Sequence, residues 1–151
     1  EASQAGVRSG IGARVICCLR PGVAGLSETI TVRSIIGRFL EHGRIYVFAN
    51  GGEFLSDKNI VMISSADLMP RNLRRRVECF MPLENPTIRK QVLHQIMVAL
   101  LRDEKNAWYL QPDGSYVHPQ TDETSFSCHE YFMSNPSLSG LGSLAATQDN
   151  G

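Results

Sequence analysis

Residues 14–48, RVICCLRPGVAGLSETITVRSIIGRFLEHGRIYVF, are the stretch that decides the expected fold. The apolar residues 15–19 predict a short buried strand, which the Pro-Gly pair at 21–22 ends because proline cannot donate a hydrogen bond to a sheet. Apolar side chains then recur with helical spacing, which predicts an amphipathic helix over residues 27–42. Residues 45–48 predict the next strand. The apolar stripe of the predicted helix consists of Val32, Ile35, Ile36, Phe39 and Leu40.

Downstream of this stretch, predicted strands alternate with predicted helices. A hairpin is expected over residues 44–64, with strands at 45–48 and 60–63, and a loop of small residues follows at 64–70. The remaining patterns predict a strand at 77–81, a helix at 87–102, strands at 108–110 and 115–117, and a short helix at 127–133. The expected fold class is therefore α/β (α+β), a mixed sheet with flanking amphipathic helices. We expect one domain over residues 1–133 and a flexible tail over residues 134–151.

Charge is distributed unevenly along a chain whose formal net charge is zero. Residues 1–50 carry six Arg against three Glu, and residues 71–90 carry six Arg or Lys against two Glu. Residues 103–151 carry seven acids and one Lys. Two basic segments that meet in space would form an anion site, whereas the zero total gives no argument for nucleic-acid or membrane binding. No apolar run approaches the roughly 18 residues of a membrane span.

The four cysteines, Cys17, Cys18, Cys79 and Cys128, show no CxxC spacing. A disulfide framework or a zinc site is therefore not expected. The apolar neighbours of the first three predict buried, reduced thiols of a cytosolic protein. The chain starts at Glu1 without Met, and residues 1–5 have the pattern of a last helical turn before a glycine, so we expect a fragment of a longer protein.

His42 is the first candidate for chemistry, at the predicted junction of helix and strand. A single histidine in this place is also compatible with a surface or helix-capping role. Three arginines, Arg14, Arg20 and Arg44, are expected nearby, and guanidinium groups bind phosphate oxygens as a bidentate fork. An imidazole between such groups can donate a hydrogen bond to a phosphate, act as a general acid or attack phosphorus.

The predicted loop after the hairpin is the second candidate. It offers hydroxyls, a carboxylate and a basic fork, and an ordinary polar loop is the alternative interpretation. The residues concerned are Ser64, Ser65, Asp67, Arg71 and Asn72. His94 is expected at the surface or at a helix contact. His118 and His129 receive no role, because no ligand partner lies at metal-binding spacing, and no metal ligand is predicted.

Four segments of the chain closely resemble the last catalytic domain of bacterial polyphosphate kinases of the larger, type-one class. They are CCLRPGV with GLSE (17–23 and 25–28), VRSIIGRFLEH (32–42), SSADLMPRNL (64–73) and AWYLQPDGSY (107–116). The resemblance extends from residue 1 to about residue 139, and runs of this length are far more specific than a short motif.

The resemblance implies an enzyme that transfers the terminal phosphate of ATP reversibly to inorganic polyphosphate through a phosphohistidine, with magnesium. It implies two phospholipase D-like catalytic domains with the active tunnel between them, of which this chain resembles the second. By position, Arg14 matches an ATP-contacting arginine, His42 the second active-site histidine, at the nucleotide phosphates, and Arg71 an arginine of the polyphosphate tunnel. The phosphate-accepting histidine and the Mg2+ contacts belong to the upstream half, so the isolated chain is expected to be inactive.

The partners implied are ATP or ADP, inorganic polyphosphate and the upstream domains of the same chain, with a homo-oligomeric full-length enzyme and no nucleic acid. The implied location is cytoplasmic, with membrane association of the full-length enzyme left open. Relative to the family pattern, Val15 replaces a glycine beside Arg14, and residues 54–58 lie in a part of the hairpin that is usually shorter or different.

Two other functions remain open from the residues alone. A phospholipase D-like phosphodiesterase would use a His-x-Lys motif followed by Asp, but Arg44 and Ala49 occupy the Lys and Asp positions, which argues against hydrolysis. A non-catalytic module that binds polyanions or oligomerises is the other alternative. The hypothesis of a phosphate site requires that Arg14 and His42 converge on one pocket.

Overall fold

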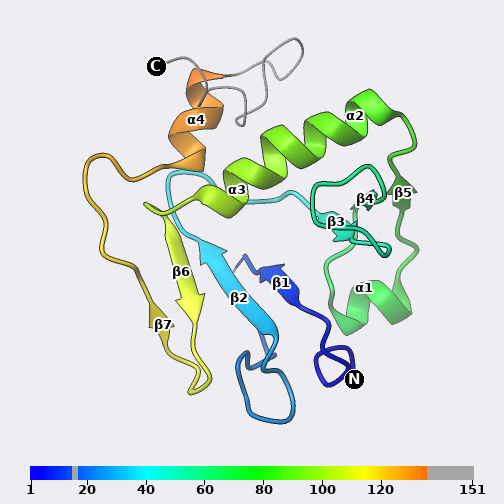
Figure 1. The fold of residues 1–151 in the computed structure, drawn as a ribbon, viewed down its shortest axis with the longest axis horizontal. Coiled ribbons are helices and arrows are strands. Elements are labelled where there is room, and N and C mark those ends of the chain that lie inside the picture. Colours follow the sequence, from blue (N-terminus) through cyan, green and yellow to red (C-terminus); the bar gives the residue numbers. More distant parts are fainter. Residues whose placement is uncertain (15–16, 136–151) are drawn as a thin grey trace. The chain divides into compact units, whose positions relative to one another are not determined.

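The structure, a computed structural model, describes residues 1–14 and 17–135 of the chain. It has the mixed α+β fold that the sequence predicted, but its strands form two sheets and not one (Figure 1). Its elements in chain order are β1 (Ser9–Gly12), β2 (Ile30–Ile35), β3 (Ile45–Phe48), β4 (Ile60–Ser64), α1 (Pro70–Arg75), β5 (Phe80–Pro82), α2 (Pro86–Gln91), the π-helical segment η1 (Val92–Met97), α3 (Val98–Arg102), β6 (Ala107–Leu110), β7 (Tyr116–Val117) and α4 (Cys128–Ser134).

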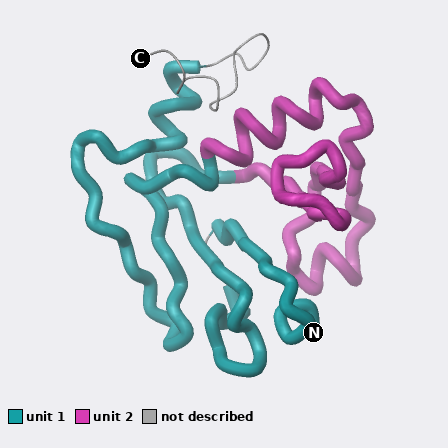
Figure 2. The backbone as a smooth tube through the Cα atoms, viewed as in Figure 1, with its two compact units in different colours: residues 1–41, 100–135 teal, residues 42–99, 136–151 magenta. Residues whose placement is uncertain are grey.

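The described chain divides into two compact units (Figure 2). Unit 1 comprises Glu1–Glu41 and Leu100–Asn135, and unit 2 comprises His42–Ala99. Each unit contains one of the sheets. The predicted tail over residues 134–151 lies almost wholly outside the described residues. Within the described ranges, every helix is too short or too polar to cross a lipid bilayer.

Unit 1 is built on a four-stranded sheet in the order β1-β2-β6-β7. β1 pairs with β2 in parallel, and β2–β6 and β6–β7 are antiparallel pairs. Alternate residues of β2 face the core, where Val32 and Ser34 are buried. The small apolar core of the unit also contains Ala107, Leu110 and Cys128.

The helix predicted over residues 27–42 is wrong, because β2 occupies its first half. The β-branched residues Ile30, Thr31 and Val32 favour a strand, where their side chains fit the pleated surface. Pairing on both sides, with β1 and β6, then outweighs the helical spacing of the apolar residues. Residues 36–42, the rest of the predicted helix, form no helix, and their large apolar side chains Phe39 and Leu40 are exposed.

The first strand also lies elsewhere than predicted. β1 is formed by Ser9–Gly12, and residues 17–20 belong to no strand. An edge strand with a parallel partner tolerates glycines that would weaken a central strand. Residues 15–16 of the predicted strand lie outside the described residues. The N-terminal residues form a hydrogen-bonded turn, with Gly6 at φ +79°, rather than an assigned helix.

The cysteine burial predicted from apolar neighbours is wrong for two of three thiols. Cys18 and Cys79 are exposed and Cys17 is half-buried, since none of the three lies inside a strand. Cys128, at the start of α4, is the buried one. All four are free thiols.

Unit 2 is built on the three-stranded antiparallel sheet β3-β4-β5. The predicted hairpin is confirmed, with Ile45 opposite Ile63 and Phe48 opposite Ile60. Asn50 and Gly51 take the positive φ angles that its turn needs. The last strand, β5, begins later than predicted, and α1 forms where a loop and a basic run were expected.

One carboxylate holds the segment that joins β4 to β5. Glu78 accepts a hydrogen bond of 2.6 Å from the Ser65 hydroxyl and one of 2.7 Å from the Asn72 amide. The Ser65 hydroxyl accepts in turn from the backbone N–H of Cys79 at 3.1 Å. These bonds connect the loop after β4, through Ser65, and α1, through Asn72, to Glu78, two residues before β5.

The predicted helix at 87–102 is confirmed as one continuous helical stretch, α2–η1–α3. Its first turn is capped by Asn85, whose side-chain oxygen accepts from the N–H groups of Thr87 and Ile88 at 3.0 and 3.2 Å. Pro86 occupies the first turn, where its missing N–H costs nothing. At the other end, the Arg33 guanidinium of β2 donates to the carbonyls of Leu100 and Leu101.

The second predicted helix, at 127–133, is confirmed as α4. Ser127 caps it by accepting from the N–H of Glu130. The capping-box spacing therefore located this helix to within one residue.

We expect Asn85→Ala to lower the free energy of unfolding by about 1 kcal/mol, because two N–H groups of α2 lose their acceptor. Urea unfolding followed by circular dichroism measures this. Asn85→Asp keeps an acceptor at the cap and should remain within a few tenths of a kcal/mol of the parent. An equal loss of unfolding free energy in both variants would show that the side-chain acceptor at the cap does not stabilise the helix.

The Glu78 bonds predict a specific acid sensitivity. Hydrogen bonds from Ser65 and Asn72 lower the pKa of Glu78. The stability that this carboxylate contributes is therefore present above its unfolded-state pKa of about 4.3 and is lost as the pH falls through the lower folded-state pKa.

In Glu78→Gln that loss cannot occur, so the free energy of unfolding should change less between pH 5 and pH 3 than in the parent. Urea unfolding at a series of pH values tests this, with the exposed Glu84→Gln as the matched control. A parent-like acid dependence in Glu78→Gln would contradict the assignment.

Candidate functional site

The candidate site of unit 2 is centred on Asp67, which follows β4. Its carboxylate accepts from Nε of Arg44, the residue before β3, at 2.9 Å. A second guanidinium, that of Arg71 in α1, approaches the other carboxylate oxygen at 3.9 Å. Asp67 therefore holds two arginines from different elements on its two oxygens.

The two guanidinium groups differ in exposure. The Arg44 side chain is 19% exposed, whereas that of Arg71 is 58% exposed. Arg44 also donates to the carbonyl of His42 at 3.4 Å, which links the start of unit 2 to the same pair. Arg44 is thus a positioned group, while Arg71 presents its charge to solvent.

Tyr46 forms a hydrogen bond with the loop that contains Asp67. Its hydroxyl donates to the carbonyl of Ala66 at 3.2 Å, and Ala66 itself is fully buried. Burial raises the pKa of Tyr46, Arg44 opposes that rise and Asp67 adds to it. The phenol therefore stays protonated and remains a donor at neutral pH.

His42 and Arg14 lie in different units. His42 is the exposed first residue of unit 2. Arg14 is half-buried in unit 1, two residues after β1, and the preceding N–H, that of Ala13, donates to the Arg33 carbonyl at 2.8 Å. The convergence of Arg14 and His42 on one pocket stays a prediction.

Sequence reasoning located the Asp67 loop but missed Glu78 and Asn72 as a bonded pair. Asn72 was grouped with the loop, whereas Glu78 fell in a predicted strand. The available signal was the acid at Glu78, two residues after the basic run at 74–76. A recess of about 170 Å³ lies beside these residues, lined by Ile63, Ser64, Ser65, Cys79 and Met81.

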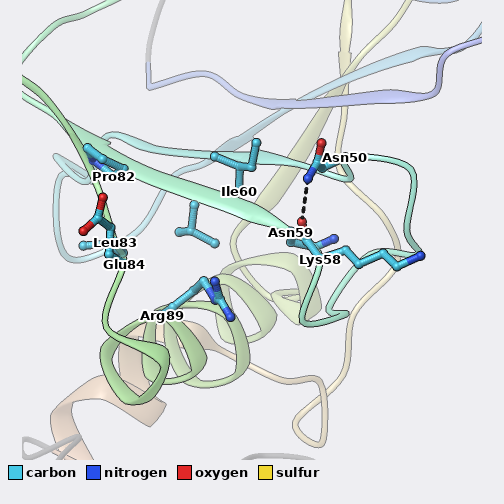
Figure 3. Close-up of a pocket in the computed structure, with 9 residues that line it drawn as sticks. Asn50, Lys58, Asn59, Ile60, Pro82, Leu83, Glu84 and Arg89 are labelled. Carbon is cyan, nitrogen blue, oxygen red and sulfur yellow. Dashed lines mark hydrogen bonds between the residues drawn. The ribbon is translucent and has the colours of Figure 1, made fainter.

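A larger cavity of about 280 Å³ lies elsewhere in unit 2 and contains none of the predicted site residues (Figure 3). It separates Arg89 of α2 from Ile60 of β4, and the Lys58 side chain extends away from it. Asn59 orders its rim by donating from Nδ2 to the carbonyls of Ala49 and Glu53.

Comparison with known proteins places these elements in a family. The sequence model of "Polyphosphate kinase C-terminal domain 2" matches residues 1–129. A polyphosphate kinase of Erythrobacter litoralis is 58% identical over 142 residues, covering 94% of this chain and 20% of that protein. One from Synechocystis is 52% identical over 133 residues, covering 87% of this chain and 17% of that protein.

The crystal structure of polyphosphate kinase from Porphyromonas gingivalis superimposes with a TM-score of 0.78 at 34% identity, covering 89% of this chain and 20% of that one. The fold is thus that of a polyphosphate kinase, consistent with the phospholipase D-like class. The chain spans about a fifth of the length of these relatives. It belongs to the polyphosphate kinase family, in the part described as C-terminal domain 2.

Proposed function

We propose that this chain forms part of the phosphate-binding site of a polyphosphate kinase, a transferase that moves the terminal phosphate of ATP reversibly to inorganic polyphosphate. The observation that carries the proposal is the pair of guanidinium groups, Arg44 and Arg71, held on one carboxylate beside the start of unit 2. The names of the similar proteins support the reaction class.

The chemistry of the substrate explains why such an arrangement is useful. A condensed phosphate chain and a transferring phosphoryl group carry dense negative charge, so catalysis depends on cations fixed in place before the reaction. Asp67 orients Arg44 through a hydrogen bond of 2.9 Å, whereas Arg71 lies 3.9 Å from the carboxylate and its exposed guanidinium can form a bidentate pair with phosphate oxygens.

In the proposed site, His42 and Arg14 contact the phosphates of ATP, and Arg71 contacts polyphosphate. The imidazole donates to a phosphate oxygen or serves as a general acid. The covalent phosphohistidine belongs to another part of the full-length enzyme in this proposal, so this chain by itself binds phosphate but does not complete a transfer.

Magnesium does not suit the carboxylates of this site. Mg2+ binds one or two carboxylates together with substrate phosphates. Asp67 is engaged by two guanidinium groups, and Glu78 by a hydroxyl and an amide. The proposal therefore assigns the magnesium contacts to the remainder of the full-length enzyme. It also includes a homo-oligomeric full-length enzyme with a cytoplasmic location.

We expect His42→Ala in the full-length enzyme to lower kcat for polyphosphate synthesis by about 100-fold or more, the usual loss when one donor to a developing charge is removed. Arg14→Ala should raise KM for ATP, because a phosphate contact made already in the ground state is lost. Lys90→Ala, an exposed cation in α2, is the control and should keep parental kinetics.

Unchanged kinetics in the first two variants, with folding intact by circular dichroism, would favour a non-catalytic module. Hydrolysis of a phosphodiester by the parent enzyme would favour the phospholipase D-like alternative.

Arg71 is tested separately by polyphosphate binding to this chain. Arg71→Ala should weaken binding and reduce its salt dependence, since one phosphate contact is removed, whereas Arg71→Lys should restore the salt dependence only, because a single ammonium cannot form the bidentate pair. Fluorescence titration at two salt concentrations measures both effects. Parental affinity in Arg71→Ala would exclude this residue from the binding surface.

A further inference from the structure

Three side chains of metal-ligand type meet in unit 1, in a place that the phosphate site does not use. Glu41, Cys128 and His129 each offer one ligand atom, and these atoms lie within 4.8 Å of one another. Cys128 and His129 open α4, whereas Glu41 lies 88 residues before His129 in the sequence. We call this set the Glu41–Cys128–His129 cluster.

Two of the three side chains of the cluster are buried, and the third is partly exposed to solvent. Cys128 is fully buried and His129 is 3% exposed, whereas the Glu41 side chain is 29% exposed. An ion could therefore reach the cluster past the Glu41 carboxylate. Nε2 of His129 lies 2.8 Å from the nearer Glu41 oxygen.

The surroundings hold these side chains in position. Asp103, which is buried, accepts from the N–H of Cys128 at 2.7 Å and from that of Asn106 at 2.6 Å. The His129 ring packs against Gly37 so closely that a Cβ at residue 37 would lie 2.6 Å from Nδ1. Only glycine at that position leaves the imidazole its present place.

The hydrogen bonding of the imidazole is incomplete. Nδ1 of His129 is buried and has no hydrogen-bond partner among the described residues. Buried polar atoms are normally paired, so an imidazole that served only as the partner of Glu41 would be expected to satisfy both nitrogens. The unpaired nitrogen is Nδ1, beside Gly37, whereas Nε2 faces Glu41, so the case for a ligand rests on the proximity of the three ligand atoms and not on this unpaired nitrogen.

The combination of imidazole, thiolate and carboxylate identifies the class of ion. Zinc and its neighbours in the first transition series accept all three ligand types, whereas magnesium and calcium prefer oxygen alone. We propose that Glu41, Cys128 and His129 bind one divalent transition-metal ion, zinc being the expected species, with water as the fourth ligand.

Binding has a definite stoichiometry and cost. The ion displaces one proton from the Cys128 thiol, which leaves to solvent, and forms a metal–sulfur bond in its place. Burial and the neighbouring Asp103 raise the pKa of that thiol, which opposes this exchange. The nearer Glu41 oxygen and His129 nitrogen must also separate to the roughly 3.3 Å that two ligands at about 2.0 Å from a tetrahedral ion require.

Cobalt(II) titration of the metal-free chain of residues 1–151 tests the proposal, because a Co2+–thiolate bond gives a charge-transfer band in the near ultraviolet. We expect this band to saturate at one Co2+ per chain and to disappear on addition of zinc. Cys128→Ser should abolish it, and His129→Gln and Glu41→Gln should each weaken Co2+ affinity at least about 10-fold.

Matched controls separate this site from the other thiols. Cys79→Ser, an exposed thiol of unit 2, and the double variant Cys17→Ser with Cys18→Ser should both keep the band. Circular dichroism checks folding, and Glu41→Gln, which keeps a hydrogen-bond acceptor for His129, should remain folded even if Cys128→Ser does not. No band at a hundredfold excess of Co2+, or a band lost only in the control variants, would overturn the proposal.

Discussion

The ion pair between Arg44 and Asp67 is the contact on which the organisation of unit 2 depends. It joins the residue before β3 to the loop after β4, so it closes the open end of the hairpin at 2.9 Å. Both side chains are largely shielded from solvent, and such a pair is weakened by salt less than an exposed one. The same contact brings the loop that leads into α1, the helix that contains Arg71, next to the strand that follows His42.

Some elements of this fold could be predicted from the sequence, because their local sequence signals favour the same structure as their tertiary contacts. The turn at Asn50 and Gly51, the Asn85 cap and the Ser127 cap each predicted an element that the structure contains. At β2 the signals disagreed. Apolar residues at helical spacing extend from Val32 to Leu40, but the strand uses only the alternation of Val32 and Ser34, and its partners are distant in sequence.

The candidate site shows the same division. Asp67 and Arg71 are four residues apart, so one loop motif predicted their proximity. The pairing of Glu78 with Ser65 depends on β5 returning beside β4, and the meeting of Glu41 with His129 depends on two segments 88 residues apart. The spacing of residues along the sequence cannot predict contacts that arise only from the tertiary fold. For this reason the sequence assigned His129 no role.

Two carboxylates of unit 2, those of Asp67 and Glu78, hold hydrogen-bond donors in place. Asp67 accepts from Arg44, and Glu78 accepts from Ser65 and Asn72, so each acid is already engaged in the absence of a ligand. A polyanion entering such a site meets cations whose orientation needs little further change, and the reorganisation that would otherwise oppose binding is small. Under the proposed function, Asp67 aids phosphate binding despite its own negative charge, because a fixed guanidinium stabilises a developing negative charge more than a freely rotating one does.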